Sequence, residues 1–185
     1  DSLNQPFAGV YSTYLLPNNH PDFERRARDA EDAIKLVYAS IFSPESRAYF
    51  NAIDYMIEEE KMAVILQEVV GNEHNGRYYP EISGVAQSYN FYPFSYIKPE
   101  DGFAVTAIGL GAYVVGGEKT HRFSPAYPKL QLASTRDKIK ASQRYFYAID
   151  LERREYDLYR DGENAAIKAY DIPEAERDGT LEYTA

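Results

Sequence analysis

The chain has 185 residues, of which 44% are hydrophobic and 26% are charged, so it is long and apolar enough to bury the core of one domain. Its net charge of −9 argues against a nucleic-acid partner, because such a partner requires a basic surface. The absence of cysteine excludes disulfides, thiolate metal sites and cysteine nucleophiles. No apolar run reaches the roughly 18 residues of a membrane span and no secretory signal is visible, so we expect a soluble, cytoplasmic protein without membrane partners.

The first part of the chain predicts one strand followed by two helices. Residues 7–16 alternate between apolar and polar side chains, which predicts a strand with Gly9 inside it. Apolar residues then recur every three or four positions, which is typical of an amphipathic helix over residues 21–42. Ser43, followed by a proline, predicts the cap of a shorter helix that ends near Ile53.

The middle of the chain predicts three strands that are neighbours in one sheet. Residues 62–70 form an almost continuous apolar run, interrupted by Gln67, which predicts a strand buried on both faces. Residues 82–89 and 103–108 are further apolar runs of strand length. Between the first two lies a polar loop at residues 71–76.

Beyond residue 128 the pattern is weaker. Residues 145–151 and 156–159 are rich in tyrosine and apolar residues, which predicts two more strands. Residues 173–177 begin with proline and predict a helix that ends at the Asp-Gly pair after it. The whole pattern indicates an α+β protein with a mixed β-sheet and flanking helices.

A glycine turn follows the strand at 103–108. Gly109 and Gly111 flank a leucine, and such a turn lets the backbone approach a ligand closely. The pattern lacks the third glycine of a dinucleotide fingerprint, and a tight turn without a ligand explains it about as well.

Four motifs in order raise the significance of this turn: residues 1–13, residues 62–70, Ser-Gly-Val-Ala at 83–86, and the Gly-Leu-Gly turn. Their succession resembles the nucleotide-binding half of phosphoenolpyruvate synthases and pyruvate phosphate dikinases. The resemblance covers roughly residues 1–127. It implies part of an ATP-grasp fold, with residues 1–128 as the nucleotide-binding region and 129–185 as a C-terminal extension of the same domain.

The resemblance also implies a set of ATP-binding residues. It places Gly9 and Thr13 in a segment that covers the phosphates, Gln67 on a strand that lines the nucleotide cleft, and Gly109 and Gly111 beside ATP. Small residues and backbone N–H groups suit phosphate oxygens, and a buried amide suits an adenine or ribose edge. ATP and Mg²⁺ are the implied cofactors, and pyruvate or phosphoenolpyruvate would be handled by other domains of a parent chain.

Two departures from the family pattern affect this site. The family has a glutamate after Gly-Leu-Gly that helps hold magnesium, and this chain has Ala112. The family also offers a glutamine and an arginine about a dozen residues later, and residues 123–127 contain neither. Because phosphoryl transfer depends on metal ions and positioned donors, both losses are severe. Glu118, Lys119 and Arg122 are the nearby residues that could substitute for these groups, and Glu118 is the candidate replacement for the metal ligand.

Three functions from different classes follow. The first is the ATP-binding fragment of a phosphoenolpyruvate synthase-like phosphotransferase, inactive in isolation. The second is a catalytically degenerate ATP-grasp relative with a regulatory or assembly role. The third is an aromatic-rich binding module for a carbohydrate or peptide, suggested by 18 tyrosines and 9 phenylalanines. The histidine spacing argues against a histidine metal site, and the abundant acids leave a paired-carboxylate glycosidase open without singling out two of them.

Overall fold

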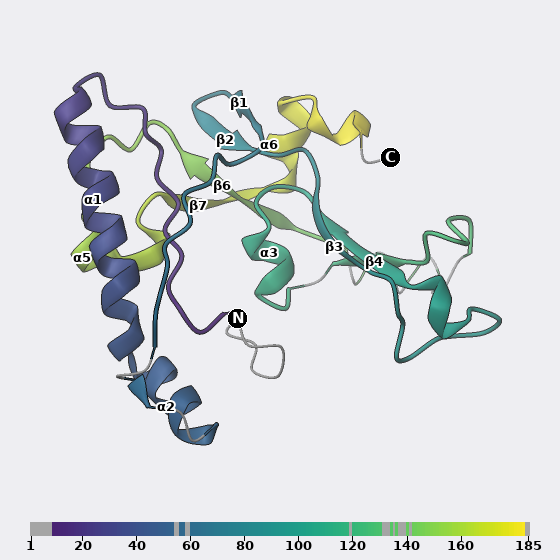
Figure 1. Ribbon diagram of the computed structural model, residues 1–185. Coiled ribbons are helices and arrows are strands. Elements are labelled where there is room, and N and C mark those ends of the chain that lie inside the picture. The colour runs from purple at the N-terminus through teal and green to yellow at the C-terminus, as the bar shows by residue number, and fades with distance from the viewer. Residues whose placement is uncertain are drawn as a thin grey trace. The chain divides into compact units, whose positions relative to one another are not determined.

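The computed structural model describes residues 9–183 except 54–55, 58–59, 119, 131–133, 135, 137–139 and 141 (Figure 1). Its residue contacts divide the chain into two compact units. Unit 1 comprises Asp1–Val69 and Ile149–Ile167, and unit 2 comprises Val70–Ala148 and Lys168–Ala185. Among the described residues, no helix is both long and apolar enough to cross a lipid bilayer.

The helices of unit 1 confirm the sequence prediction. Helix α1 spans Phe23–Ala39, and the Asp22 side chain caps it by accepting a hydrogen bond from the Glu24 N–H at 3.0 Å. The 3₁₀ turn η1 (Ser40–Phe42) links it to helix α2 (Pro44–Ala52). Ser43 caps α2, as its position before proline predicted.

The core of unit 1 joins α1 to a segment more than a hundred residues later. Ala33 of α1 packs with Leu158 and Ala165, and the partly buried Tyr14, Leu16, Leu36 and Tyr156 surround them. Leu158 begins the short helix α5 (Leu158–Asp161), which lies against α1 (Figure 1) and is followed by the 3₁₀ turn η4 (Gly162–Asn164). The predicted strand at 156–159 is therefore wrong. The Asp157 carboxylate accepts from the N–H groups of Tyr159 and Arg160, which starts a helical turn instead.

The predicted strand at 7–16 is wrong over residues 9–16, while residues 7 and 8 lie outside the described residues. Gly9 lies in a turn with φ of 78°. The Ser46 hydroxyl donates to the Val10 carbonyl at 2.8 Å, and the Ser12 N–H donates to Ser40 Oγ at 3.1 Å. These serines occupy backbone groups that a strand ladder would need.

The predicted strand at 62–70 is also wrong, since this segment has neither helix nor strand structure. Ile65, Leu66 and Val70 are 79%, 72% and 82% exposed, and Gln67 is exposed rather than buried. A strand requires a neighbouring strand to complete its ladder, and the sheets of the described residues do not include this segment. The apolar run has the composition of a strand, but composition does not show which other strand would pair with it.

Unit 2 contains a three-stranded antiparallel sheet that carries the glycine turn. Strands β3 (Ser83–Gln87), β4 (Phe103–Ala107) and β5 (His121–Phe123) lie in the order β3-β4-β5. Ser83 is opposite Ala107, and Gln87 is opposite Phe103. Two of the three predicted strands are thus confirmed as neighbours. The 3₁₀ turn η3 (Pro99–Asp101) precedes β4.

A second sheet has the order β1-β2-β6-β7. Its strands are β1 (Asn72–His74), β2 (Arg77–Tyr79), β6 (Tyr145–Asp150) and β7 (Ile167–Asp171), of which β6 was predicted. Strands β1 and β2 form a hairpin around Asn75 and Gly76, whose φ angles are 48° and 77°. Asn-Gly with two positive φ angles is the strongest short hairpin signal, so the polar loop predicted at 71–76 is in fact a hairpin.

The core of unit 2 lies between this sheet and helix α6 (Ile172–Arg177), which confirms the predicted C-terminal helix. Tyr79, Phe146, Ala148 and Ala175 are fully buried together. The helix ends at Asp178, and the 3₁₀ turn η5 (Thr180–Tyr183) follows. Helices and strands in both units confirm the α+β class.

A network of polar side chains closes this core. The buried Asp178 carboxylate accepts from the Tyr79 hydroxyl at 2.7 Å and from Asn75 Nδ2 at 2.6 Å. Arg77 lies 3.7 Å from Asp178 and 2.9 Å from Glu174. Burial raises the pKa of Tyr79, and its hydrogen bond to Asp178 adds to this, so the hydroxyl stays a donor.

Candidate functional site

The glycine turn follows β4 in unit 2, and a glutamine side chain fixes its entry. The Ile108 N–H donates to Gln143 Oε1, while Gln143 Nε2 donates to the Ile108 and Tyr145 carbonyls, each at 2.9 Å. One amide therefore satisfies both backbone groups of Ile108 and ties it to the start of β6. This positions the turn against the second sheet.

Gly109 is required by the fold itself. Its φ is 85°, and a Cβ added there would lie 2.7 Å from the Tyr147 carbonyl oxygen and 2.9 Å from Phe146 Cβ. Its N–H donates to the Pro80 carbonyl at 3.2 Å, and its carbonyl accepts from the Ser83 hydroxyl at 2.5 Å. Close packing on β6 thus explains this glycine without a ligand.

Gly111 differs from Gly109 in its φ angle and in the space around its Cα. Its φ is −58°, which any residue adopts, and an added Cβ would meet only Ser83 Cβ at 4.0 Å. Leu110 before it is 3% exposed and donates its N–H to the Tyr147 carbonyl at 2.8 Å. The N–H groups of Gly111 and Ala112, in contrast, have no acceptor among the described residues. The fold therefore leaves open space and two donors at this end of the turn.

Ala112 begins the four-residue helix α3 (Ala112–Val115) and is exposed, so no carboxylate stands at the position where the family has glutamate. Tyr113 of α3 is buried and packs edge-on against Tyr145, with ring centres 5.3 Å apart. It also contacts Tyr147, with ring centres 6.1 Å apart. Tyr113, Tyr145 and Tyr147 thus form a tyrosine cluster, which packs against α3 directly after the glycine turn.

Glu118 is linked to this tyrosine cluster. The Tyr145 hydroxyl donates a hydrogen bond to the Glu118 carboxylate, and this bond, with burial and Tyr147, raises the pKa of Tyr145. Burial and the charge of Glu118 raise the pKa of Tyr113 as well. Glu118 is therefore a half-buried carboxylate held on the same cluster that supports the turn.

A magnesium ion in a nucleotide site is held by one or two carboxylates together with substrate phosphates. Among the described residues, no three His, Asp or Glu side chains are grouped closely enough to hold a metal ion. With alanine at 112, the acid that the described structure places on the tyrosine cluster beside the turn is Glu118. These residues fit magnesium only where bound phosphates complete its coordination.

The other predicted ATP-binding residues lie in unit 1. Gly9 has open space around its Cα, and Thr13 and Gln67 are both exposed. The hydrogen bonds from Ser40 and Ser46 fix the backbone between Gly9 and Thr13. The structure thus brings Gly109, Gly111 and Glu118 together within unit 2, and it holds the remaining three in the other unit.

Three side chains that hold the turn or Glu118 in place were not predicted from the sequence: Ser83, Gln143 and Tyr145. Ser83 belongs to a motif that the sequence assigned to a strand without chemistry. Gln143 contacts Ile108 across 35 residues in a region of weak pattern, so no local signal could have identified it. Tyr145 was part of a predicted strand, and its hydroxyl contact is set by tertiary packing alone.

Comparison with known proteins adds one match. The family model described as pyruvate phosphate dikinase, AMP/ATP-binding domain, matches residues 1–179. No curated protein and no solved structure matches the chain. The match includes residues of both units and extends well past residue 127, where the resemblance in the sequence ended.

Proposed function

We infer, because the chain belongs to the family of AMP/ATP-binding domains of pyruvate phosphate dikinase, that its glycine turn binds the phosphates of ATP. The family confirms the resemblance seen in the sequence. We further propose that the domain is part of an ATP-grasp fold and of a phosphoenolpyruvate synthase-like phosphotransferase in the cytoplasm. Pyruvate and phosphoenolpyruvate would then be handled by other domains of the parent chain.

The observation that carries this proposal is the contrast between the two glycines. Packing on β6 accounts for Gly109, whereas nothing in the fold accounts for the missing side chain at Gly111. Backbone N–H groups beside an empty Cβ position suit phosphate oxygens, which approach the main chain closely. The unpaired N–H groups of Gly111 and Ala112 supply two such donors.

The residues of unit 1 have a supporting role in the proposal. We propose Gly9, Thr13 and Gln67 as ATP-binding residues of unit 1, as the family resemblance implies. Gly9 offers open space, and the exposed hydroxyl of Thr13 and amide of Gln67 are accessible to a ligand.

Magnesium, when bound with ATP, would neutralise charge on the phosphates. We propose Glu118 as its protein ligand, replacing the carboxylate that Ala112 lacks. Tyr145 would orient this carboxylate through the hydrogen bond described above. The alternative function, a degenerate ATP-grasp relative with a regulatory or assembly role, is favoured by Ala112 itself, and magnesium dependence separates the two.

Replacing Gly111 by valine should weaken ATP binding at least about tenfold, because the side chain fills the space left for a phosphate and screens both N–H donors. The unchanged chain should bind ATP with a dissociation constant of about a millimolar, since the geometry identifies backbone contacts rather than charged ones. Isothermal titration calorimetry with ATP measures both constants. Circular dichroism should show an unchanged fold.

Ala126→Val, at an exposed position of unit 2, is the matched control for added bulk and should bind ATP normally. Equal affinity of Gly111→Val and the unchanged chain would contradict the assignment of phosphates to this turn.

Replacing Glu118 by glutamine should abolish the gain in ATP affinity that magnesium confers, because the amide cannot neutralise the ion. Tyr145→Phe is the control variant: it removes the hydrogen bond to Glu118 but keeps the carboxylate, so most of the gain should remain. Titrations with ATP, with and without magnesium, give the comparison. If magnesium leaves the affinity of the unchanged chain unaltered, the degenerate alternative is preferred.

A further inference from the structure

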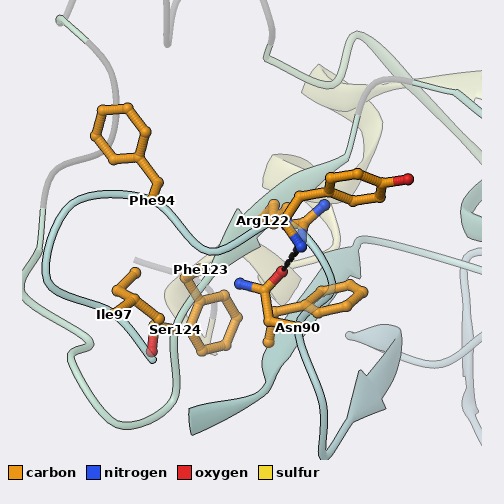
Figure 2. Close-up of a pocket in the computed structure, with 8 residues that line it drawn as sticks. Asn90, Phe94, Ile97, Arg122, Phe123 and Ser124 are labelled. Atoms are coloured by element: carbon orange, nitrogen blue, oxygen red, sulfur yellow. Dashed lines mark hydrogen bonds between the residues drawn. The ribbon is translucent and has the colours of Figure 1, made fainter. Parts of the chain in front are cut away.

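A hollow lies at one end of the three-stranded sheet of unit 2, and we call it the aromatic hollow. It encloses a cavity of about 40 Å³ and opens to solvent. Figure 2 shows the side chains that line it, which come from the loop after β3 and from the end of β5: Asn90, Phe94, Ile97, Arg122, Phe123 and Ser124. Tyr92 and Phe103 complete the lining.

Arg122 brings a positive charge to the aromatic hollow and is held in place from two sides. Its guanidinium lies 3.9 Å from the centre of the Phe103 ring, and it donates to Asn90 Oδ1 at 2.9 Å (Figure 2). Within the part of the chain that the structure describes, no carboxylate lies within ion-pair distance of Arg122. A guanidinium has five N–H donors and prefers carboxylates, so donors remain for an acidic ligand.

Ser124 adds a second polar group that lacks a partner. Its side chain lines the aromatic hollow and the residue is 3% exposed, yet its Oγ has no hydrogen-bond partner among the described residues. Buried hydroxyls are almost always paired, because leaving them unpaired costs free energy. A polar atom of a ligand in the hollow would satisfy Ser124.

The walls of the aromatic hollow suit a flat apolar body. Tyr92 and Phe94 are 85% and 64% exposed, and their neighbours Phe91 and Tyr96 are 73% and 59% exposed. Such a concentration of exposed aromatic side chains in one loop marks a binding surface rather than ordinary scatter. Aromatic rings stack on planar ligands in offset or edge-on geometry.

The aromatic hollow is separate from the glycine turn. The turn follows Ala107 at the end of β4, whereas the hollow includes Phe103 at its beginning. The rise of a strand separates the two ends by roughly 14 Å. The family match assigns nothing to this second place.

We propose that the aromatic hollow binds a small organic acid with a planar apolar body, of the aromatic carboxylate class. Arg122 pairs with the carboxylate, the exposed rings of Tyr92 and Phe94 pack on the planar body, and Ser124 hydrogen-bonds a polar atom of the ligand. The hollow would be a second site, independent of ATP.

Three probes test this proposal on the full chain: phenylacetate, its neutral relative phenylacetamide, and acetate, which lacks the ring. Titrations followed by two-dimensional ¹H–¹⁵N NMR should show saturable binding of phenylacetate, with a dissociation constant of about a millimolar and shifts near residues 90–97 and 122–124. Phenylacetamide and acetate should each bind at least about tenfold more weakly. Saturating ATP should leave the affinity for phenylacetate unchanged.

Arg122→Gln should remove the preference for phenylacetate over phenylacetamide. Ser124→Ala should leave phenylacetate unchanged but weaken 4-hydroxyphenylacetate, whose phenol is a second polar group, a few-fold. Arg26→Gln is the matched control, because Arg26 also lies over an aromatic ring, that of Phe23, but in unit 1. It should leave binding unchanged. If Arg122→Gln does not fold, Arg122→Lys keeps the charge but loses the planar fork, and it should reduce the preference in part.

Several results would overturn the proposal. Binding of phenylacetate that does not saturate by about 20 mM would do so, as would equal affinity for the amide and the acid. So would an unchanged preference for the acid in the Arg122 variants, or displacement of phenylacetate by ATP. The last result would assign the aromatic hollow to the nucleotide site.

Discussion

Replacing Gly109 by alanine is expected to destabilise unit 2 by about 3 kcal/mol or more. Two costs add. The φ of 85° is strained for any residue with a Cβ, and that Cβ would lie 2.7 Å from the Tyr147 carbonyl oxygen, well inside normal contact distance. The nearest atom is a backbone oxygen of β6, and the next two belong to the fully buried side chain of Phe146, so neither neighbour can easily move aside. Urea unfolding followed by tyrosine fluorescence measures the loss.

Gly111→Ala is the matched control for this expectation. Both positions lie in the same turn, but Gly111 has an ordinary φ and room for a methyl group. Its unfolding free energy should therefore change by less than about 1 kcal/mol. Equal losses at the two positions would show that the turn does not pack against β6 as described.

The second large effect is expected at Asp178. Its carboxylate is fully buried and serves Tyr79, Asn75 and Arg77 at once, so Asp178→Ala removes an acceptor of the buried Tyr79 hydroxyl and one of the two acids beside Arg77. We expect a loss of about 3 kcal/mol in unfolding free energy, because removing one partner of a buried charged network costs far more than breaking a surface ion pair. Urea unfolding at neutral pH measures this loss.

Glu174→Ala provides the comparison. Glu174 pairs with the same Arg77 at 2.9 Å, but its side chain is 27% exposed, so water can replace much of what is lost. Its effect should be clearly smaller than that of Asp178→Ala. A larger loss for Glu174→Ala than for Asp178→Ala would contradict this. It would mean that the ion pair of Arg77 with Glu174 stabilises the fold more than the buried Asp178 carboxylate does.

The helices were predictable because their signals are local. Asp22 and Ser43 cap α1 and α2 within the same few residues that carry the apolar period. Strands β3 and β4 were also predictable, since each apolar run finds the other as a neighbour. In these places propensity, pattern and packing agree.

The errors arose where distant side chains or missing neighbours decide the structure. Ser40 and Ser46 take the hydrogen bonds that would have made residues 9–16 a strand, and no sequence pattern links the two segments. Residues 62–70 have the composition of a strand but belong to neither sheet of the described residues. At Asp157 a capping side chain overrides an alternating pattern. The Asn75-Gly76 hairpin, in contrast, was readable and was overlooked.

The candidate site was also predictable only in part from the sequence. The sequence identified both glycines, but not that Gly109 serves the fold while Gly111 is free of it. That distinction depends on where β6 lies, and β6 follows the turn by more than thirty residues. The substitution of alanine for glutamate at 112 was visible in the sequence, whereas the link between Glu118 and Tyr145 required the structure.

The hydrogen bonds of Gln143 and Tyr147 to the glycine turn have a consequence for synthesis of the protein. Gln143 follows Ile108 by 35 residues, and Tyr147 lies further still along the chain. During translation the ribosome therefore makes the turn well before the residues that fix it. A nascent chain that stops before Tyr147 contains the complete Gly-Leu-Gly sequence, yet its turn has no acceptor for the Leu110 N–H. Nucleotide should therefore begin to protect the growing chain from proteolysis only after β6 has left the exit tunnel.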